Sequence, residues 1–140
     1  MFSQRIGQVM QGEQLLTAPG HTTVAAAAQQ MAGRGVSAIV VVDDERVVGI
    51  FTERDAVFRV IACNRDPART PLREVMTPQP LTLGPGESFG HALALMHERR
   101  IRHVPVVEQG RAVGIVSARD ALDPDLEEFV VEAQRRRSLS

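Results

Sequence analysis

The octet GIFTERDA, residues 49–56, returns 65 residues later as GIVSARDA, residues 114–121. The match extends well beyond the octet, because segment 15–57 aligns with segment 80–122 without a gap. A gap-free internal match of this length predicts two copies of one supersecondary unit. Identical pairs include Leu16/Leu81, Thr17/Thr82, Ala27/Ala92, Met31/Met96, Val41/Val106, Val42/Val107, Arg46/Arg111, Gly49/Gly114, Ile50/Ile115, Arg54/Arg119 and Asp55/Asp120.

Each copy begins with apolar residues at helical spacing, which predicts an amphipathic helix. These residues are Val24, Ala27, Ala28 and Met31 in the first copy, and Phe89, Ala92, Leu93 and Met96 in the second. A short extended segment is expected before each helix, around LLT (15–17) and PLTL (80–83).

Two short β-branched runs follow each of these helices, with turn residues between them, and such a pattern predicts a β-hairpin. The runs are 36–43 and 47–51 in the first copy, and 101–108 and 112–116 in the second. A second helix is expected directly after each hairpin, and in the first copy Ala56, Val57, Val60 and Ile61 would share one face. The repeating unit is therefore helix, strand, strand, helix.

The repeat divides the chain into four parts. We expect the first repeat at 5–62, a surface linker at 63–71 with the sequence CNRDPARTP, and the second repeat at 72–122. Residues 123–140 form a predicted helical tail, with acids near its start and Arg135 to Arg137 at its end, as the helix dipole favours. We interpret this tail as a packing or dimer-contact helix rather than a nucleic-acid-binding arm.

The composition is that of a globular protein with one shared core. The chain has 140 residues, 44% of them hydrophobic and 24% charged, with a net charge of -1 and a pI near 6.4. This balance argues against binding of nucleic acid or an anionic membrane. No apolar run is long enough for a membrane span and no signal peptide is recognisable, so we expect a cytoplasmic protein.

Few residue types suited to catalysis or metal binding stand out. Cys63 is the only cysteine, so it cannot form an intramolecular disulfide, and we interpret it as inert. The four histidines lack the i, i+4 spacing of a metal pair, so no metal site and no catalytic cofactor are predicted. Phe51 and Phe58 are expected to pack in the core.

The polar half of each octet has two interpretations. Thr52 and Asp55, like Ser117 and Asp120, have the spacing of a capping box at the start of a helix. The same helix start could instead offer free N–H groups and a hydroxyl to a phosphate. An ionised Asp is acceptor-only, so it could bind the vicinal hydroxyls of a ribose, with the neighbouring Arg54 or Arg119 near the phosphate.

The two octets, IRHVPVV (101–107) and VMTPQPLTL (75–83) together resemble a tandem pair of CBS domains, that is, cystathionine β-synthase-type domains, over about residues 5–122. The resemblance implies an α+β fold of two β-α-β-β-α units related by a pseudo-twofold axis, with two clefts between them. Members of the family bind AMP, ADP, ATP, NAD or S-adenosylmethionine in these clefts and usually regulate another protein.

Carried over by position, the resemblance implies a set of nucleotide-binding residues in both copies. Asp55 and Asp120 would bind the ribose, and Thr52 and Ser117 the phosphate side. Base-lining positions would be Thr17, Thr82, Ser37, Ala38, Arg102, His103 and Val104. Both copies depart from the family pattern in carrying Arg54 or Arg119 before the acid, where a Ser or Thr is frequent.

The two clefts are not expected to be equivalent, because IRHVPVV supplies two potential cations and VSAIVVV (36–42) supplies none. We therefore expect one cleft to bind a phosphorylated ligand better than the other. The leading hypothesis is a regulatory sensor of an adenosine-containing nucleotide that signals to a partner protein and forms a homodimer through Val57, Val60 and Ile61. The alternatives are a structural adaptor without ligand and, less favoured, a nucleotide-hydrolysing enzyme.

Overall fold

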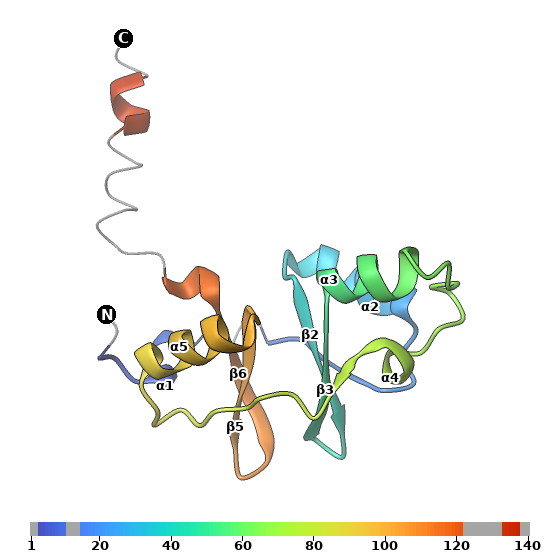
Figure 1. Ribbon diagram of the computed structural model, residues 1–140, viewed down its shortest axis with the longest axis horizontal. Helices are drawn as coiled ribbons and strands as arrows, with labels where there is room; N and C mark the ends of the chain where they lie inside the picture. Colours follow the sequence, from blue (N-terminus) through green and yellow to red (C-terminus); the bar gives the residue numbers. More distant parts are fainter. Residues whose placement is uncertain (1–2, 11–14, 122–132, 138–140) are drawn as a thin grey trace.

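The computed structural model describes residues 3–10, 15–121 and 133–137, and it has two similar halves side by side, each built on a β-hairpin (Figure 1). The first half contains β1 (Thr17–Pro19), α2 (Val24–Arg34), β2 (Ala38–Asp43), β3 (Arg46–Thr52), α3 (Glu53–Asp55) and η2 (Ala56–Ile61). The second contains α5 (Phe89–Arg99), β5 (His103–Glu108), β6 (Arg111–Ser117) and η3 (Ala118–Ala121). Three short elements lie outside this division: the helices α1 (Ile6–Val9) and α4 (Leu72–Val75), and β4 (Thr77–Pro78), which pairs with β3. The predicted order of helix, strand, strand and helix is confirmed in the first half, and in the second half the described residues show the short 3₁₀-helix η3 after β6.

The strands form one sheet in the order β1-β2-β3-β6-β5, with β4 paired to β3. The hairpins turn at Asp44 and Glu45, and at Gln109 and Gly110, where all four residues have positive φ, as two-residue hairpin turns of type I′ require. The halves join where the hairpin tips meet, through the pair Arg46 and Arg111. The extended segment predicted at 15–17 becomes β1, whereas its counterpart makes a single parallel bridge from Leu83 to Val106.

The two long helices have matching ends. The hydroxyls of Thr23 and Ser88 accept hydrogen bonds from the first turns of α2 and α5. At the other end the chain enters the left-handed conformation, with φ of 65° at Gly35 and 57° at Arg100. Glycine adopts this conformation without steric cost, whereas arginine does not.

Replacing Arg100 by glycine is therefore expected to stabilise the protein. Removing Cβ relieves a left-handed penalty of roughly 1–2 kcal/mol, and the greater freedom of glycine in the unfolded chain takes back about 0.4–1 kcal/mol. A net gain of up to about 1 kcal/mol should appear in the free energy of unfolding measured with urea. The matched substitution Gly35→Ala should lower the same quantity, and a loss of stability in both variants would contradict the explanation.

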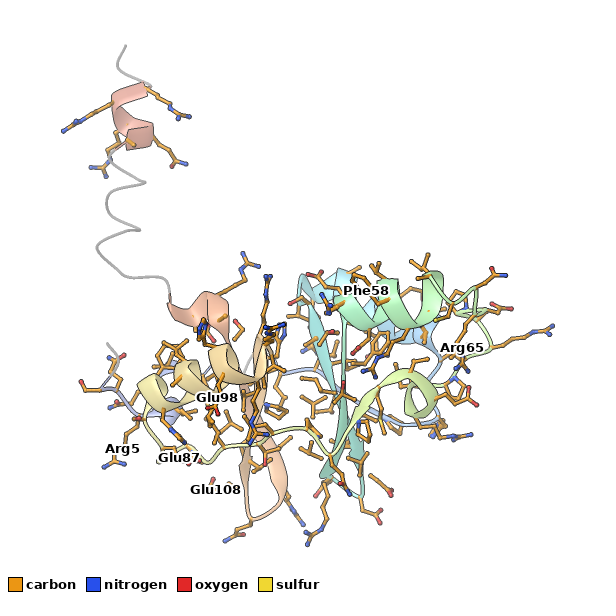
Figure 2. The ribbon with its side chains drawn as sticks, in the orientation of Figure 1. Arg5, Phe58, Arg65, Glu87, Glu98 and Glu108 are labelled. Carbon is orange, nitrogen blue, oxygen red and sulfur yellow. The ribbon has the colours of Figure 1, made fainter. Side chains whose placement is uncertain are left out.

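The apolar interior consists of two separate cores, one in each half, so the expectation of one shared core was wrong. The two short helices are exchanged between the cores, which means that each packs in the core of the opposite repeat. Ile6 of α1 packs in the second core, and Leu72 and Val75 of α4 pack in the first. Backbone hydrogen bonds stabilise this exchange, because the Ile6 amide donates to the Glu87 carbonyl and the Leu72 amide donates to the Thr22 carbonyl. Figure 2 shows Arg5 and Glu87 at the same side of the second half.

The glycines of the two octets are needed for close packing against methionines. A Cβ on Gly49 would overlap Sδ of Met76, and a Cβ on Gly114 would lie 2.6 Å from Sδ of Met10. Met76 directly follows α4, and Met10 directly follows α1. Because the octet glycines have no side chains, these two methionines can pack closely on the strands that contain the glycines. This packing accounts for the two glycines without a ligand.

The helix after the first octet presents more apolar surface than its sequence pattern predicts. Residues 56–61 form a π-helix, with the Ala62 amide bonded to the Val57 carbonyl, so helical spacing of 3.6 does not hold there. Val60 is buried, but Val57 is 50% exposed, Phe58 56% and Ile61 71%. The expectations of one apolar face and of a core position for Phe58 were wrong, whereas Phe51 is fully buried as expected.

Within the described residues, every helix falls short of the length and apolar character that crossing a membrane requires. The predicted tail lies mostly outside these residues, and 133–137 is helical.

Candidate functional site

A cavity of about 350 Å³ lies between the two halves. The first half contributes the loop from Gly35 to Ala38, which connects α2 to β2. The second half contributes the start of β5 and the region where β6 passes into η3. The second-half residues that line the cavity are His103, Ile115, Ser117, Arg119 and Asp120.

The backbone brings these side chains together in the same way at both octets. In the register of the hairpins, Ala38 pairs with Thr52 and His103 pairs with Ser117. One residue further on, the amide of Glu53 donates to the Ser37 carbonyl and the amide of Ala118 donates to the Arg102 carbonyl. Each octet hydroxyl therefore lies at the end of a hairpin, next to the loop that precedes the first strand of that hairpin.

Asp120 lines the cavity and takes part in a local cap. Its Oδ2 accepts a hydrogen bond of 2.8 Å from the amide of Ser117. The residue is half-buried, and it lines the cavity together with Ser117 and Arg119. An ionised carboxylate can accept about four hydrogen bonds, so the cap leaves capacity for a ligand.

Asp55 is held more completely. Its Oδ2 accepts from the amide of Thr52 at 2.9 Å and from the Thr52 hydroxyl at 3.3 Å. The amide of Asp55 in turn donates to the Thr52 hydroxyl at 3.3 Å, which completes the predicted capping box. Its Oδ1 lies 3.5 Å from Nε of Arg59, and the residue is only 7% exposed. Arg59 also donates to the carbonyls of Val75 and Met76, so it ties Asp55 to the end of α4.

The sequence prevents the same arrangement at the second octet. The position that corresponds to Arg59 is occupied by Pro124, which has no charge and no side-chain donor. Among the described residues, the two acids therefore differ in their partners although the octets that carry them match.

His103 connects the halves inside the cavity. Its Nε2 lies 2.9 Å from Oγ of Ser37, a hydrogen bond between residues of different copies. Burial lowers the pKa of His103 below 6.5, the nearby carboxylates of Glu53 and Asp120 oppose this shift, and Arg102 adds to it. The imidazole is therefore neutral at neutral pH.

Six of the thirteen residues predicted to bind nucleotide line this cavity together. They are Ser37, Ala38, His103, Ser117, Arg119 and Asp120. Three more, Thr52, Arg54 and Asp55, belong to the other octet, where the guanidinium of Arg54 lies 4.4 Å from the ring centre of Phe58.

The remaining predicted residues lie around these groups in different settings. Arg102 is exposed next to His103, Thr17 is exposed on β1, and Thr82 is half-buried next to Leu83. Val104 is fully buried in the second core, so its side chain does not line the cavity.

Sequence reasoning missed three lining residues, which are Gly35, Val36 and Ile115. The apolar pair reads as core in the sequence, whereas the glycine could have been found as the residue that ends the first helix.

The cavity combines one carboxylate, two hydroxyls, one guanidinium and one imidazole with apolar groups from Val36, Ala38 and Ile115. Such a set can hold a ligand that has hydroxyl groups, an anionic group and a flat apolar part. Among the described residues, no cluster of three or more His, Cys, Asp or Glu side chains is placed to hold a metal ion.

The chain spans only part of the length of the curated relatives that it matches, from 13% to 76% in the three described next. The meiotically up-regulated gene 70 protein of Schizosaccharomyces pombe is 41% identical over 92 residues, which is 66% of this chain and 13% of that protein. The Methanopyrus kandleri protein MK0525 is 30% identical over 87% of this chain and 63% of its own length. The CBS domain-containing protein YhcV of Bacillus subtilis is 36% identical over 76% of each chain.

Solved structures of similar shape include two complexes, which together contain three adenosine compounds. A protein with CBS domains from Burkholderia ambifaria MC40-6 has a TM-score of 0.78 at 32% identity, covering 84% of this chain and 90% of its own. The CBS domain protein PAE2072 of Pyrobaculum aerophilum, complexed with AMP, has a TM-score of 0.78 at 26% identity and covers 91% and 98%. The CBS domain pair of MJ0100, in complex with 5'-methylthioadenosine and S-adenosyl-L-methionine, has a TM-score of 0.76 at 26% identity and covers 84% and 95%.

The repeat, the paired hairpins and the octets now have a common explanation. The family model for the CBS domain matches twice, at residues 6–62 and 72–126, which together make up most of the sequence. The chain belongs to the CBS domain family, and it contains two CBS domains.

Proposed function

We propose that the chain is a non-catalytic regulatory module that binds an adenosine-containing nucleotide between its two CBS domains and signals the bound state to a partner protein. The observation that carries this proposal is the cavity in which Ser117, Arg119 and Asp120 of the second octet face Ser37 and Ala38 of the first domain. A site formed by two domains can couple ligand binding to their arrangement, provided that the ligand favours one arrangement.

The groups in the cavity suit the parts of such a ligand. The Asp120 carboxylate would accept hydrogen bonds from the ribose hydroxyls, and Ser117 and Arg119 would donate to the phosphate. Val36, Ala38 and Ile115 would contact the base. The roles of Thr17, Thr82, Arg102 and Val104 rest on the family resemblance alone.

The first octet is proposed to be the weaker site. Asp55 is capped by Thr52 and paired with Arg59, so a ribose would have to compete with the ion pair. The repeat counterpart of His103 in the first copy is Ala38, which offers no polar side chain. These differences support the expectation that the two clefts bind ligand unequally.

The complexes of PAE2072 with AMP and of MJ0100 with S-adenosyl-L-methionine support an adenosine compound as the ligand of this chain as well. AMP, ADP, ATP, NAD and S-adenosylmethionine are the candidates. They share the ribose and the adenine, and they differ in what is attached at the 5' carbon.

Thermal unfolding of the nucleotide-stripped protein should reveal the ligand. A ligand at a hundred times its dissociation constant adds about 2.7 kcal/mol to the native state. This stabilisation corresponds to an increase in Tm on the order of 5–10 °C for a domain of this size. We expect such a shift with one or more adenosine compounds and a smaller one with the matching guanosine compound. The absence of a shift with every adenosine compound would contradict the proposal.

A structural adaptor is the competing function, because the capping hydrogen bonds at Asp55 and Asp120 already account for both acids without a ligand. An adaptor would show no ligand-dependent change in Tm. A phosphohydrolase would release phosphate from ATP or AMP, and a turnover assay on the same samples tests for it.

We also propose a homodimer that forms through the helix after the first octet. Val57, Phe58 and Ile61 are the large apolar side chains that stand out as exposed among the described residues, and all three belong to η2 (Figure 2 labels Phe58). A second copy would bury this surface against the same surface, as a twofold interface requires. Val60, which was expected to take part, is buried in the first core instead.

Substituting Ile61 by glutamate should shift the protein from dimer to monomer. The side chain is 71% exposed, so the monomer should tolerate the change within about 0.5 kcal/mol, whereas two facing carboxylates would oppose association. Sedimentation of the wild type and the variant measures the difference. A matched control is Gln30→Glu, which adds the same charge to an exposed position of α2. A dimer that persists in the Ile61 variant would place the interface elsewhere.

A further inference from the structure

The imidazole of His103 lies in the cavity between the two halves and bonds to a residue of the other half. Backbone pairing places it beside Ser117, and its Nε2 bonds across the halves to the hydroxyl of Ser37. The polar and charged residues that line the same cavity as the ring are Ser37, Ser117, Arg119 and Asp120. Any ligand held by Asp120 and Ser117 therefore lies next to this histidine.

The pKa of the His103 ring depends on a balance between burial and the charged groups around it. Glu53 and Asp120 favour the protonated imidazolium, whereas burial and Arg102 disfavour it, and burial has the largest effect. The histidine is therefore neutral in the empty cavity at neutral pH. An added negative charge would act together with the two carboxylates and raise the pKa of the ring.

The hydrogen bond to Ser37 is compatible with both charge states. A neutral imidazole has one donor nitrogen and one acceptor nitrogen, whereas the imidazolium has two donors. The Ser37 hydroxyl can donate or accept, so it can keep the ring in place across the cavity while the proton is gained. The other nitrogen then offers a charged donor, which suits a phosphate.

We propose that a phosphate-bearing adenosine ligand binds in this cavity together with one proton, which is taken up by His103. The inference rests on the proposed function and specifies how that site distinguishes a phosphorylated ligand from an uncharged one. The repeat supplies this histidine only once, because the corresponding position in the first copy is Ala38. Nucleotide affinity then rises as the pH falls, so the module responds to nucleotide and pH jointly.

The sign follows from the two pKa values of His103. Binding raises its pKa from a value below 6.5 in the free protein to a higher value in the complex. Between these values the complex holds more protons than the free protein, so lowering the pH favours binding by up to about tenfold per pH unit. Above the higher pKa, and below the lower one, this histidine contributes no pH dependence.

Titration calorimetry of the full chain with AMP measures the proton directly. At pH 7.5 the phosphate of AMP is a dianion, since the second pKa of a phosphate monoester is about 6. The apparent binding enthalpy should therefore differ between two buffers of different ionisation enthalpy, as expected for uptake of up to one proton. Adenosine, which has the same ribose and base, should bind without uptake. In His103→Gln, which keeps a hydrogen-bonding side chain without a titratable group, the uptake should disappear.

The outcomes separate this inference from the proposed function. AMP binding with the same enthalpy in both buffers, or uptake that persists in His103→Gln, would overturn the proton uptake and leave nucleotide binding intact. Binding of S-adenosylmethionine but not of AMP would also overturn it and leave adenosine recognition intact. Failure of every adenosine compound to bind would overturn both.

Discussion

Replacing Ile6 by alanine is expected to lower the free energy of unfolding by about 2–5 kcal/mol, although the residue stands near the start of the chain. Ile6 has no exposed surface and packs with Leu83, Phe89 and Val104 in the second core. Alanine removes three carbon atoms and leaves a cavity that the surrounding side chains fill only in part. Urea unfolding of both proteins under the same conditions measures the loss.

The control lies two residues away in the same segment. Gln4 is exposed, and its carbonyl accepts a hydrogen bond from the amide of Phe89, which a substitution of its side chain preserves. Gln4→Ala is therefore expected to change the stability by no more than about 0.5 kcal/mol. An equally small effect of Ile6→Ala would mean that α1 does not complete the core of the second domain.

The helices and hairpins were predictable because their signals are local. The apolar positions of α2 and α5 recur at helical spacing, with Thr23 and Ser88 as caps. At the hairpin tips, Asp44 and Gly110 are residue types that positive φ angles favour, whereas Glu45 and Gln109 are not. Since the second copy repeats these signals 65 residues later, each prediction was supported twice.

The exchange of α1 and α4 could not be predicted in the same way. Each is only four residues long, too short for a periodic apolar pattern. The aligned region begins at residue 15, after α1, so the repeat gave no information about which core Ile6 would join. The division into two cores follows from the same long-range contacts, which no local pattern encodes.

Part of the difference between Asp55 and Asp120 could be predicted from the sequence. The repeat identified Asp55 and Asp120 as equivalent, and Arg59 lies four residues after Asp55, a spacing at which helical side chains pair. The exposure of Val57 and Ile61 could not be predicted from the sequence. The prediction assumed the residue spacing of an α-helix, and a π-helix has a different spacing.

Asparagine at position 120 is expected to weaken the binding of the adenosine ligand by roughly 10- to 100-fold. Asparagine has nearly the shape of aspartate but lacks its charge, and its amide nitrogen donates where the second carboxylate oxygen accepts. A hydrogen bond to a charged group contributes about 1.5–3 kcal/mol, and each 1.4 kcal/mol is about tenfold in the dissociation constant. Titration calorimetry with the ligand identified by thermal unfolding gives the change in affinity.

The matched variant Asp55→Asn changes the same atoms in the other octet, so it controls for any effect on the helix cap. In both variants the amide oxygen of asparagine can still accept the capping hydrogen bond, and asparagine caps helices about as well as aspartate does. Asp55→Asn should keep wild-type affinity, because Arg59 and Thr52 already occupy both oxygens of that carboxylate. Equal losses of affinity in the two variants would mean that the clefts are equivalent. Unchanged affinity in Asp120→Asn would show that this carboxylate only caps its helix.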